Sequence, residues 1–106
     1  MTEQQSRAQQ LVGDVAPKLA ELTDEVLFGD VWARPGLSPR DRSLITVAGL
    51  TALGRDAQLR SHLNLALDNG VTQEELAEAA THLAFYAGWP AGMTAATTLK
   101  EVLDAR

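Results

Sequence analysis

The segment LITVAGLTAL, residues 44–53, is apolar on almost every face if it forms a helix. Ser38 and Pro39 precede it, and a serine cap followed by a first-turn proline is a strong helix start. Gly54 marks its end. Such a helix is either central to a large core or covered by another subunit. A chain of 106 residues leaves much of its surface uncovered, which favours the second arrangement.

Residues typical of helix starts and ends recur along the rest of the chain, and no run of alternating β-branched residues indicates a strand. Thr72 and Glu75 form a capping box that opens a helix over residues 73–87, and Gly70 ends a helix over residues 57–69. The other expected features are a helix over residues 3–14, one from Pro17, one capped by Thr23, a turn at Pro35–Gly36, and a last helix over residues 91–105. We therefore predict an all-α fold, a single compact bundle of about six helices.

Charge and cysteine content exclude several classes of function. The net charge is −5 and the pI is about 4.8, so no basic stripe is available for nucleic acid or an anionic membrane. The chain has no cysteine, which excludes thiol redox chemistry, disulfides and cysteine-ligated metals. The N-terminus is polar, and no apolar run approaches the roughly 20 residues that span a bilayer. We expect a cytoplasmic protein.

Two histidines lie beside apolar helix faces. His62 borders the stripe formed by Leu59, Leu63 and Ala66, where it is either a partly buried histidine with a backbone partner or a general acid/base. His82 lies four residues before Tyr86 and shares its face, so packing against that ring is the simpler interpretation. No carboxylate stands at ligand spacing beside either histidine, so we expect no metal.

Two arginines occupy the first turn of the helix that begins at Pro39. Arg40 is expected to be solvated or to pair with a nearby carboxylate. Arg42 lies one turn before Ile45 and Thr46, closer to the apolar stripe. It either forms an ion pair that holds the helix start or anchors a ligand carboxylate, which a guanidinium binds through two hydrogen bonds.

Residues 82–93, HLAFYAGWPAGM, hold three of the five aromatic side chains, Phe85, Tyr86 and Trp89. Gly88 and Pro90 break the helix there. The rings are either core filler at a helix corner or the wall of a pocket. The following helix begins with N–H groups that lack internal partners, and small residues would let an anion approach them. We expect an anion-accepting wall that faces His62.

Three segments together resemble the carboxymuconolactone decarboxylase family: LSPRDRSLITVAGLTALGR, HLNLALDNGVTQEEL and HLAFYAGWPAGM. The resemblance covers about residues 28–104, which would form the core, with residues 1–27 as an N-terminal helical extension of one domain. It implies the alkylhydroperoxidase D-like all-helical fold and a homo-oligomer, either a trimer or a hexamer. The family includes enzymes that remove carbon dioxide from 4-carboxymuconolactone in aromatic catabolism, and we expect this chain to use no cofactor.

The family's motif positions can be matched one by one to residues of this sequence. The positions that match the family pattern are His62, Gly70, Glu75, Tyr86, Gly88 and Pro90. The two cysteines of the peroxidase members would fall on Arg55 and Gln58, so this chain is not a thiol peroxidase. Where decarboxylase-like members usually read RELI, this chain reads RSLI. Arg42 is retained, and Ser43 stands at the acidic position.

Two functions follow from these patterns. The first is a lyase or isomerase acting on a small unsaturated carboxylate or lactone, with His62 as acid/base and Arg42 holding a carboxylate. The residues expected to contact its substrate are Tyr86, Trp89, Gly88, His82 and Thr46. The second is a non-catalytic oligomeric module that binds a small ligand or accompanies an enzyme. The absence of cysteine and the serine at position 43 speak for the second, but the lyase or isomerase is the main prediction and the non-catalytic module is the alternative.

Overall fold

In the computed structural model, the described residues are 5–106. They form helices and contain no strand, which confirms the predicted all-α class. The chain divides into two units, one ending at Leu37 and the other running from Ser38 to Arg106. The expected border between an N-terminal extension and a core, after residue 27, stays a prediction.

Within its described residues, 5–37, the first unit holds three short helical elements. They are α1 (Arg7–Val12), α2 (Pro17–Leu22) and the π-helix η1 (Thr23–Val31). The expected first helix, residues 3–14, ends earlier than predicted, and residues 3 and 4 lie outside the described part of the chain. Pro17 opens α2 as predicted.

The prediction that Thr23 caps a new helix is wrong. Its hydroxyl donates to the carbonyl of Leu19 at 2.7 Å, so it is used within the preceding turn. Leu22 has right-handed helical backbone angles. Helix α2 therefore continues into η1 without the extended residue that a cap requires.

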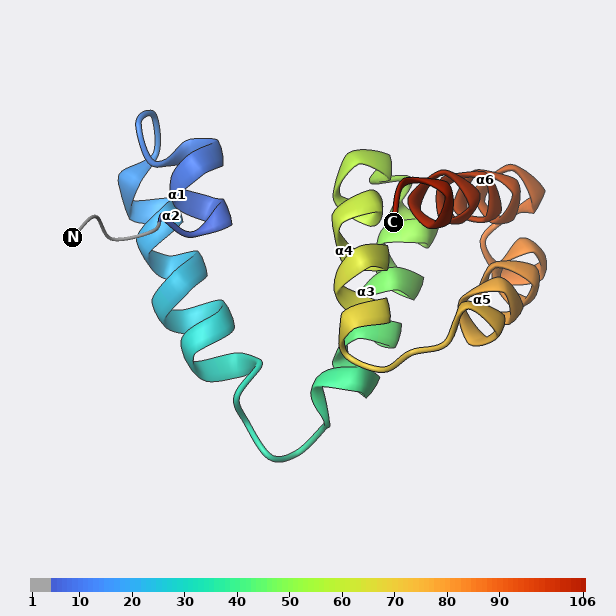
Figure 1. Ribbon diagram of the computed structural model, residues 1–106, viewed down its shortest axis with the longest axis horizontal. Helices are drawn as coiled ribbons and strands as arrows, with labels where there is room; N and C mark the ends of the chain where they lie inside the picture. Colours follow the sequence, from blue (N-terminus) through green and yellow to red (C-terminus); the bar gives the residue numbers. More distant parts are fainter. Residues whose placement is uncertain (1–4) are drawn as a thin grey trace. The chain divides into compact units, whose positions relative to one another are not determined.

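The second unit holds four α-helices whose ends agree closely with the sequence signals (Figure 1). They are α3 (Pro39–Leu53), α4 (Asp56–Asp68), α5 (Gln73–Tyr86) and α6 (Trp89–Ala105). The Ser38 hydroxyl accepts from the backbone N–H of Asp41. Gly54 and Gly70 follow α3 and α4 with positive φ angles of 70° and 98°, which glycine adopts without steric cost.

The core of this unit lies where α3 packs against α4 and where α6 packs against α4 and α5. Its buried apolar residues are Val47, Leu59, Leu63, Ala66, Val71, Leu76, Ala80, Ala95, Leu99 and Val102. Much of the apolar segment 44–53 stays outside it, because Ile45 is 57% and Leu53 is 69% exposed. Helix α3 is thus not central to a large core.

The corner between α5 and α6 depends on two glycines. Gly88 has a φ of 109° and is the N-cap of α6, which begins two residues earlier than predicted. Gly92 is buried, and a Cβ added there would lie 2.7 Å from the Cβ of Ala84 and 2.9 Å from the carbonyl oxygen of Ala80. Its small size lets the two helices pack closely, which is a different role from the expected ligand approach.

Glu75 joins the start of α5 to the start of α3. One carboxylate oxygen accepts from the backbone N–H of Thr72, which completes the predicted capping box, and the other pairs with Arg40. The hydrogen bond from Thr72, and then the one from Arg40, hold the pKa of this carboxyl below its usual value of 4.5. Arg40 also contacts Asp41. Of the two alternatives predicted for Arg40, the structure therefore shows pairing with carboxylates.

Replacing Thr72 with alanine removes the side-chain acceptor for the N–H of Glu75. We expect the free energy of unfolding to fall by about 1 kcal/mol, the usual cost of losing an N-cap. Urea unfolding at one fixed protein concentration measures the change. Thr97→Ala is the matched control, because that exposed threonine lies inside α6 and caps nothing. Equal losses in the two variants would contradict the capping role.

Candidate functional site

His62 lies on α4, one turn from the buried residues Leu59 and Ala66 and next to buried Leu63. Its own side chain is partly buried, as the apolar stripe predicts. Burial lowers the pKa of its imidazole below the ordinary value of 6.5, because desolvation disfavours the charged form. The neutral imidazole therefore predominates at neutral pH.

Arg42 and Thr46 lie on α3, which packs directly against the helix that carries His62. Both are partly buried. The hydroxyl of Thr46 donates to the carbonyl of Arg42 at 2.7 Å, so its proton is committed to the backbone and its oxygen is left as an acceptor. These three residues are the sequence-predicted site members that the fold places on one pair of contacting helices.

Ser43 is fully buried and is the fifth residue of α3. The side-chain amide of Asn69, the C-cap of α4, donates to its hydroxyl oxygen at 3.0 Å. The resemblance places a carboxylate at position 43, whereas this chain has a hydroxyl there that is hydrogen-bonded to an uncharged amide. Asn69 was missed by sequence reasoning, because the residues DNG indicate only where a helix ends.

The aromatic side chains within residues 82–93 are more exposed than core filler would be. Tyr86 is 79% and Trp89 is 60% exposed. His82 is also exposed, not at the edge of the buried face as predicted. Its ring stacks on Tyr86 with centroids 4.8 Å apart, and Phe85 meets Trp89 edge-on at 5.6 Å. These residues form a ring cluster on the surface of α5 and α6.

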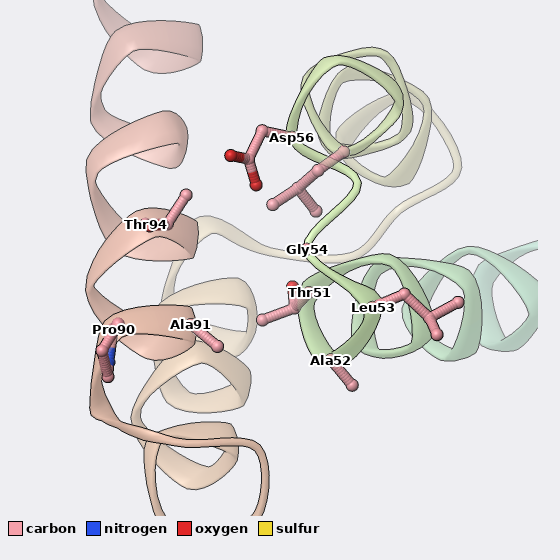
Figure 2. Close-up of a pocket in the computed structure, with 9 residues that line it drawn as sticks. Thr51, Ala52, Leu53, Gly54, Asp56, Pro90, Ala91 and Thr94 are labelled. Atoms are coloured by element: carbon pink, nitrogen blue, oxygen red, sulfur yellow. The ribbon is translucent and has the colours of Figure 1, made fainter.

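Two cavities border α6. The smaller, of about 170 Å³, is lined by Ala80, Thr81, Ala84, Trp89, Gly92, Met93 and Ala96. The larger, of about 290 Å³, lies where α3 ends and where α4 and α6 begin (Figure 2). Neither His62 nor Arg42 lines either one. A pocket wall of Tyr86, Gly88 and Trp89 that faces His62 stays a prediction.

Residues 5–106 contain neither a cluster of metal ligands nor a helix that could cross a membrane. No three histidine, aspartate or glutamate side chains gather there as metal ligands would. None of the helices in that range combines the length and the apolar character that crossing a membrane requires.

Comparison with known proteins gives one family and several relatives. The model of the carboxymuconolactone decarboxylase family matches residues 17–101. The 4-carboxymuconolactone decarboxylase of Acinetobacter baylyi is 49% identical over 75 residues, which cover 71% of this chain and 56% of that protein. The nitrosuccinic acid decarboxylase npaB of Metarhizium robertsii is 36% identical over 84 residues, or 79% of this chain and 59% of that protein.

A third relative is an uncharacterized 15.0 kDa protein of Paracoccus denitrificans, encoded between nqo9 and nqo10. It is 35% identical over 69 residues, or 63% of this chain and 52% of that protein. The chain thus spans a little over half the length of each of these relatives.

The lowered pKa of His62 predicts how stability depends on pH. Below pH 6.5 the imidazole binds a proton in the unfolded chain but not in the folded one. The free energy of unfolding therefore decreases as the pH is lowered, until the pH passes the folded pKa. His62→Gln should abolish this loss, measured by urea unfolding at pH values on either side of 6.5. His82→Gln leaves the buried imidazole in place and should keep it.

A separate loss is expected at lower pH in every variant. The pKa of Glu75 is held below 4.5, so the stability it contributes is present above that pH and disappears as its carboxylate is protonated. A pH dependence near 6 that survives His62→Gln would show that another group is responsible.

Proposed function

Because this chain belongs to the carboxymuconolactone decarboxylase family, we propose that it is a cofactor-independent decarboxylase of a small unsaturated carboxylated lactone. The observation that carries the proposal is the family match over residues 17–101. The matched region includes the partly buried His62, and the chain has no cysteine that could act as a thiol peroxidase. Two relatives are named for decarboxylation of different compounds, so the likeness supports the reaction class more strongly than one substrate. We place the reaction in the cytoplasm, in the breakdown of aromatic compounds.

His62 would supply the proton in this reaction. The bond between the carboxyl carbon and the lactone ring breaks, carbon dioxide leaves, and the electron pair moves into the conjugated lactone carbonyl. A ring carbon then takes a proton from the imidazolium of His62, which recovers one from water. A bound carboxylate near His62 would favour the imidazolium and offset the effect of burial on the pKa.

Arg42 would orient the substrate. An ion pair with the leaving carboxylate would stabilise the reactant and oppose the loss of carbon dioxide. The guanidinium is therefore better used on a carboxylate that is retained, or on the carbonyl oxygen where negative charge develops. Thr46, one turn further along α3, would offer its oxygen as an acceptor beside it.

A non-catalytic ligand-binding or accessory module is the second candidate. The specific observation in its favour is Ser43, which is fully buried and bonded to Asn69. That position therefore brings no carboxylate to the site. Calorimetric binding of 4-carboxymuconolactone without release of carbon dioxide would favour this second function over the first.

We also propose that the chain forms a homo-oligomer, a trimer or a hexamer. The support is the exposed apolar surface of the second unit, where Ile45 on α3 and the rings of Phe85 and Tyr86 on α5 are each more than half exposed. Large exposed apolar patches usually mark an association site. Assembly would also supply a cover for the ring cluster, including His82 and Trp89.

Replacing His62 with glutamine should lower the turnover of 4-carboxymuconolactone by about 10²- to 10⁴-fold, the usual contribution of a general acid. Release of carbon dioxide measures it. Ser61→Ala, an exposed neighbour on α4, is the matched control and should turn over normally. A His62→Gln variant that keeps full activity, while folded by circular dichroism, would rule out this role.

Replacing Phe85, which is 74% exposed, with glutamate should lower the assembled mass measured by light scattering after size exclusion. The added charge would have to be desolvated at an apolar interface. Glu78→Lys, an exposed charge change on the same helix, should leave the mass unchanged. A wild-type chain that is monomeric across the concentrations tested would contradict the oligomer.

A further inference from the structure

The larger cavity, of about 290 Å³, is separate from the proposed acid–base residues. Its lining residues are Thr51, Ala52, Leu53, Gly54, Asp56, Leu59, Pro90, Ala91 and Thr94. The floor includes buried Leu59, and Pro90 and Ala91 add apolar surface from the start of α6. Its size is near the lower end of small-molecule sites, which combine apolar walls with a few polar groups.

Asp56 brings a full negative charge to this cavity. It is the first residue of α4, and Figure 2 shows its carboxylate directed toward α6. Within residues 5–106, none of the hydrogen bonds or ion pairs involves that carboxylate. No lysine, arginine or histidine is among the lining residues, so nothing there neutralises it.

Thr94 brings a hydroxyl that the helix does not use. On the same helix, the hydroxyls of Thr97 and Thr98 each donate to the carbonyl four residues earlier, at 2.7 Å. Thr94 forms no such bond with any described residue. Its side chain points instead into the space between α6 and α4 (Figure 2). The side chains of Asp56 and Thr94 therefore border one cavity from two helices.

The helix ends around the cavity do not reverse its sign. The C-terminal end of α3 borders it through residues 51–54 and carries partial negative charge, about half a unit. The N-terminal ends of α4 and α6 carry similar positive charge. The three ends together add about half a positive unit, which is smaller than the full negative charge of Asp56 in the first turn of α4. The net charge around the cavity is therefore negative because of the Asp56 carboxylate.

We propose that this cavity binds a small primary amine with an apolar body. Its ammonium group donates to the Asp56 carboxylate and to the Thr94 hydroxyl oxygen, and its apolar part lies against Leu59 and Ala91. Carboxylates are repelled, so the acid substrate proposed for Arg42 does not compete for this site. The amine is thus a second ligand of the chain.

Benzylamine, benzyl alcohol and benzoate provide three probes of similar shape that are cationic, neutral and anionic at neutral pH. Saturation-transfer NMR on the full chain should show benzylamine binding in the millimolar range and benzoate not binding. Asp56→Asn should weaken benzylamine binding by about 5- to 10-fold, and Thr94→Val by about 2- to 5-fold.

Two matched controls separate the site from general attraction to an acidic protein. Asp104→Asn removes the same charge from an exposed position near the end of α6, and Thr97→Val removes a hydroxyl that the helix already uses. Both should bind benzylamine like the wild type. Ala91→Leu should block binding by filling the cavity without altering any charge.

The proposal is overturned if benzylamine shows no saturation transfer, if benzoate binds as tightly, or if Asp56→Asn weakens binding no more than Asp104→Asn does. Loss of binding confined to Asp56→Asn, Thr94→Val and Ala91→Leu supports it. None of these results depends on whether the chain decarboxylates a lactone.

Discussion

Ser43 and Asn69 form the contact on which the arrangement of the site depends. The serine is fully buried near the start of α3, and the asparagine ends α4, 26 residues later. Their hydrogen bond fixes the start of one helix beside the end of the other, which makes α3 and α4 antiparallel neighbours. A buried hydroxyl without this partner would cost more than the bond contributes, so the register of the two helices is well specified.

That register determines what Arg42 and His62 can do. Arg42 is adjacent to Ser43 in the first turn of α3, and His62 lies on the partner helix among buried leucines. Each is partly rather than fully buried, so desolvation perturbs the imidazole without sealing it from solvent. In the proposed decarboxylation, His62 would act as proton donor once it is protonated, and Arg42 would hold the anion.

Helix ends were predictable from the sequence because each has a local cause. Ser38, Thr72, Gly54 and Gly70 act within one turn of the backbone, and the structure places all four as expected. Thr23 failed because its hydroxyl can equally bond to the preceding turn, a choice that local sequence does not decide. Nothing in the sequence pattern of Thr23–Val31 predicts its π-helical form.

The site was less predictable because it depends on contacts between helices. Periodicity placed His62 correctly at the edge of a buried stripe, yet it placed His82 in a similar setting that the structure exposes. Both lie beside apolar residues along the chain, and only the packing of α4 between α3 and α6 distinguishes them. Asp56 and Thr94 are distant in sequence and were missed, because nothing short of the fold brings α4 and α6 together.

The two polar regions of the second unit carry opposite charge. In the proposed site, Arg42 would hold an anion on the α3–α4 pair, whereas we propose that Asp56 binds a cation at the cavity between the ends of α3, α4 and α6. In a chain with a net charge of −5, the long-range field disfavours any acid substrate, so its binding must come from close contacts such as a bidentate arginine. A small amine has the reverse advantage, because the same field draws it toward the protein before any specific contact forms.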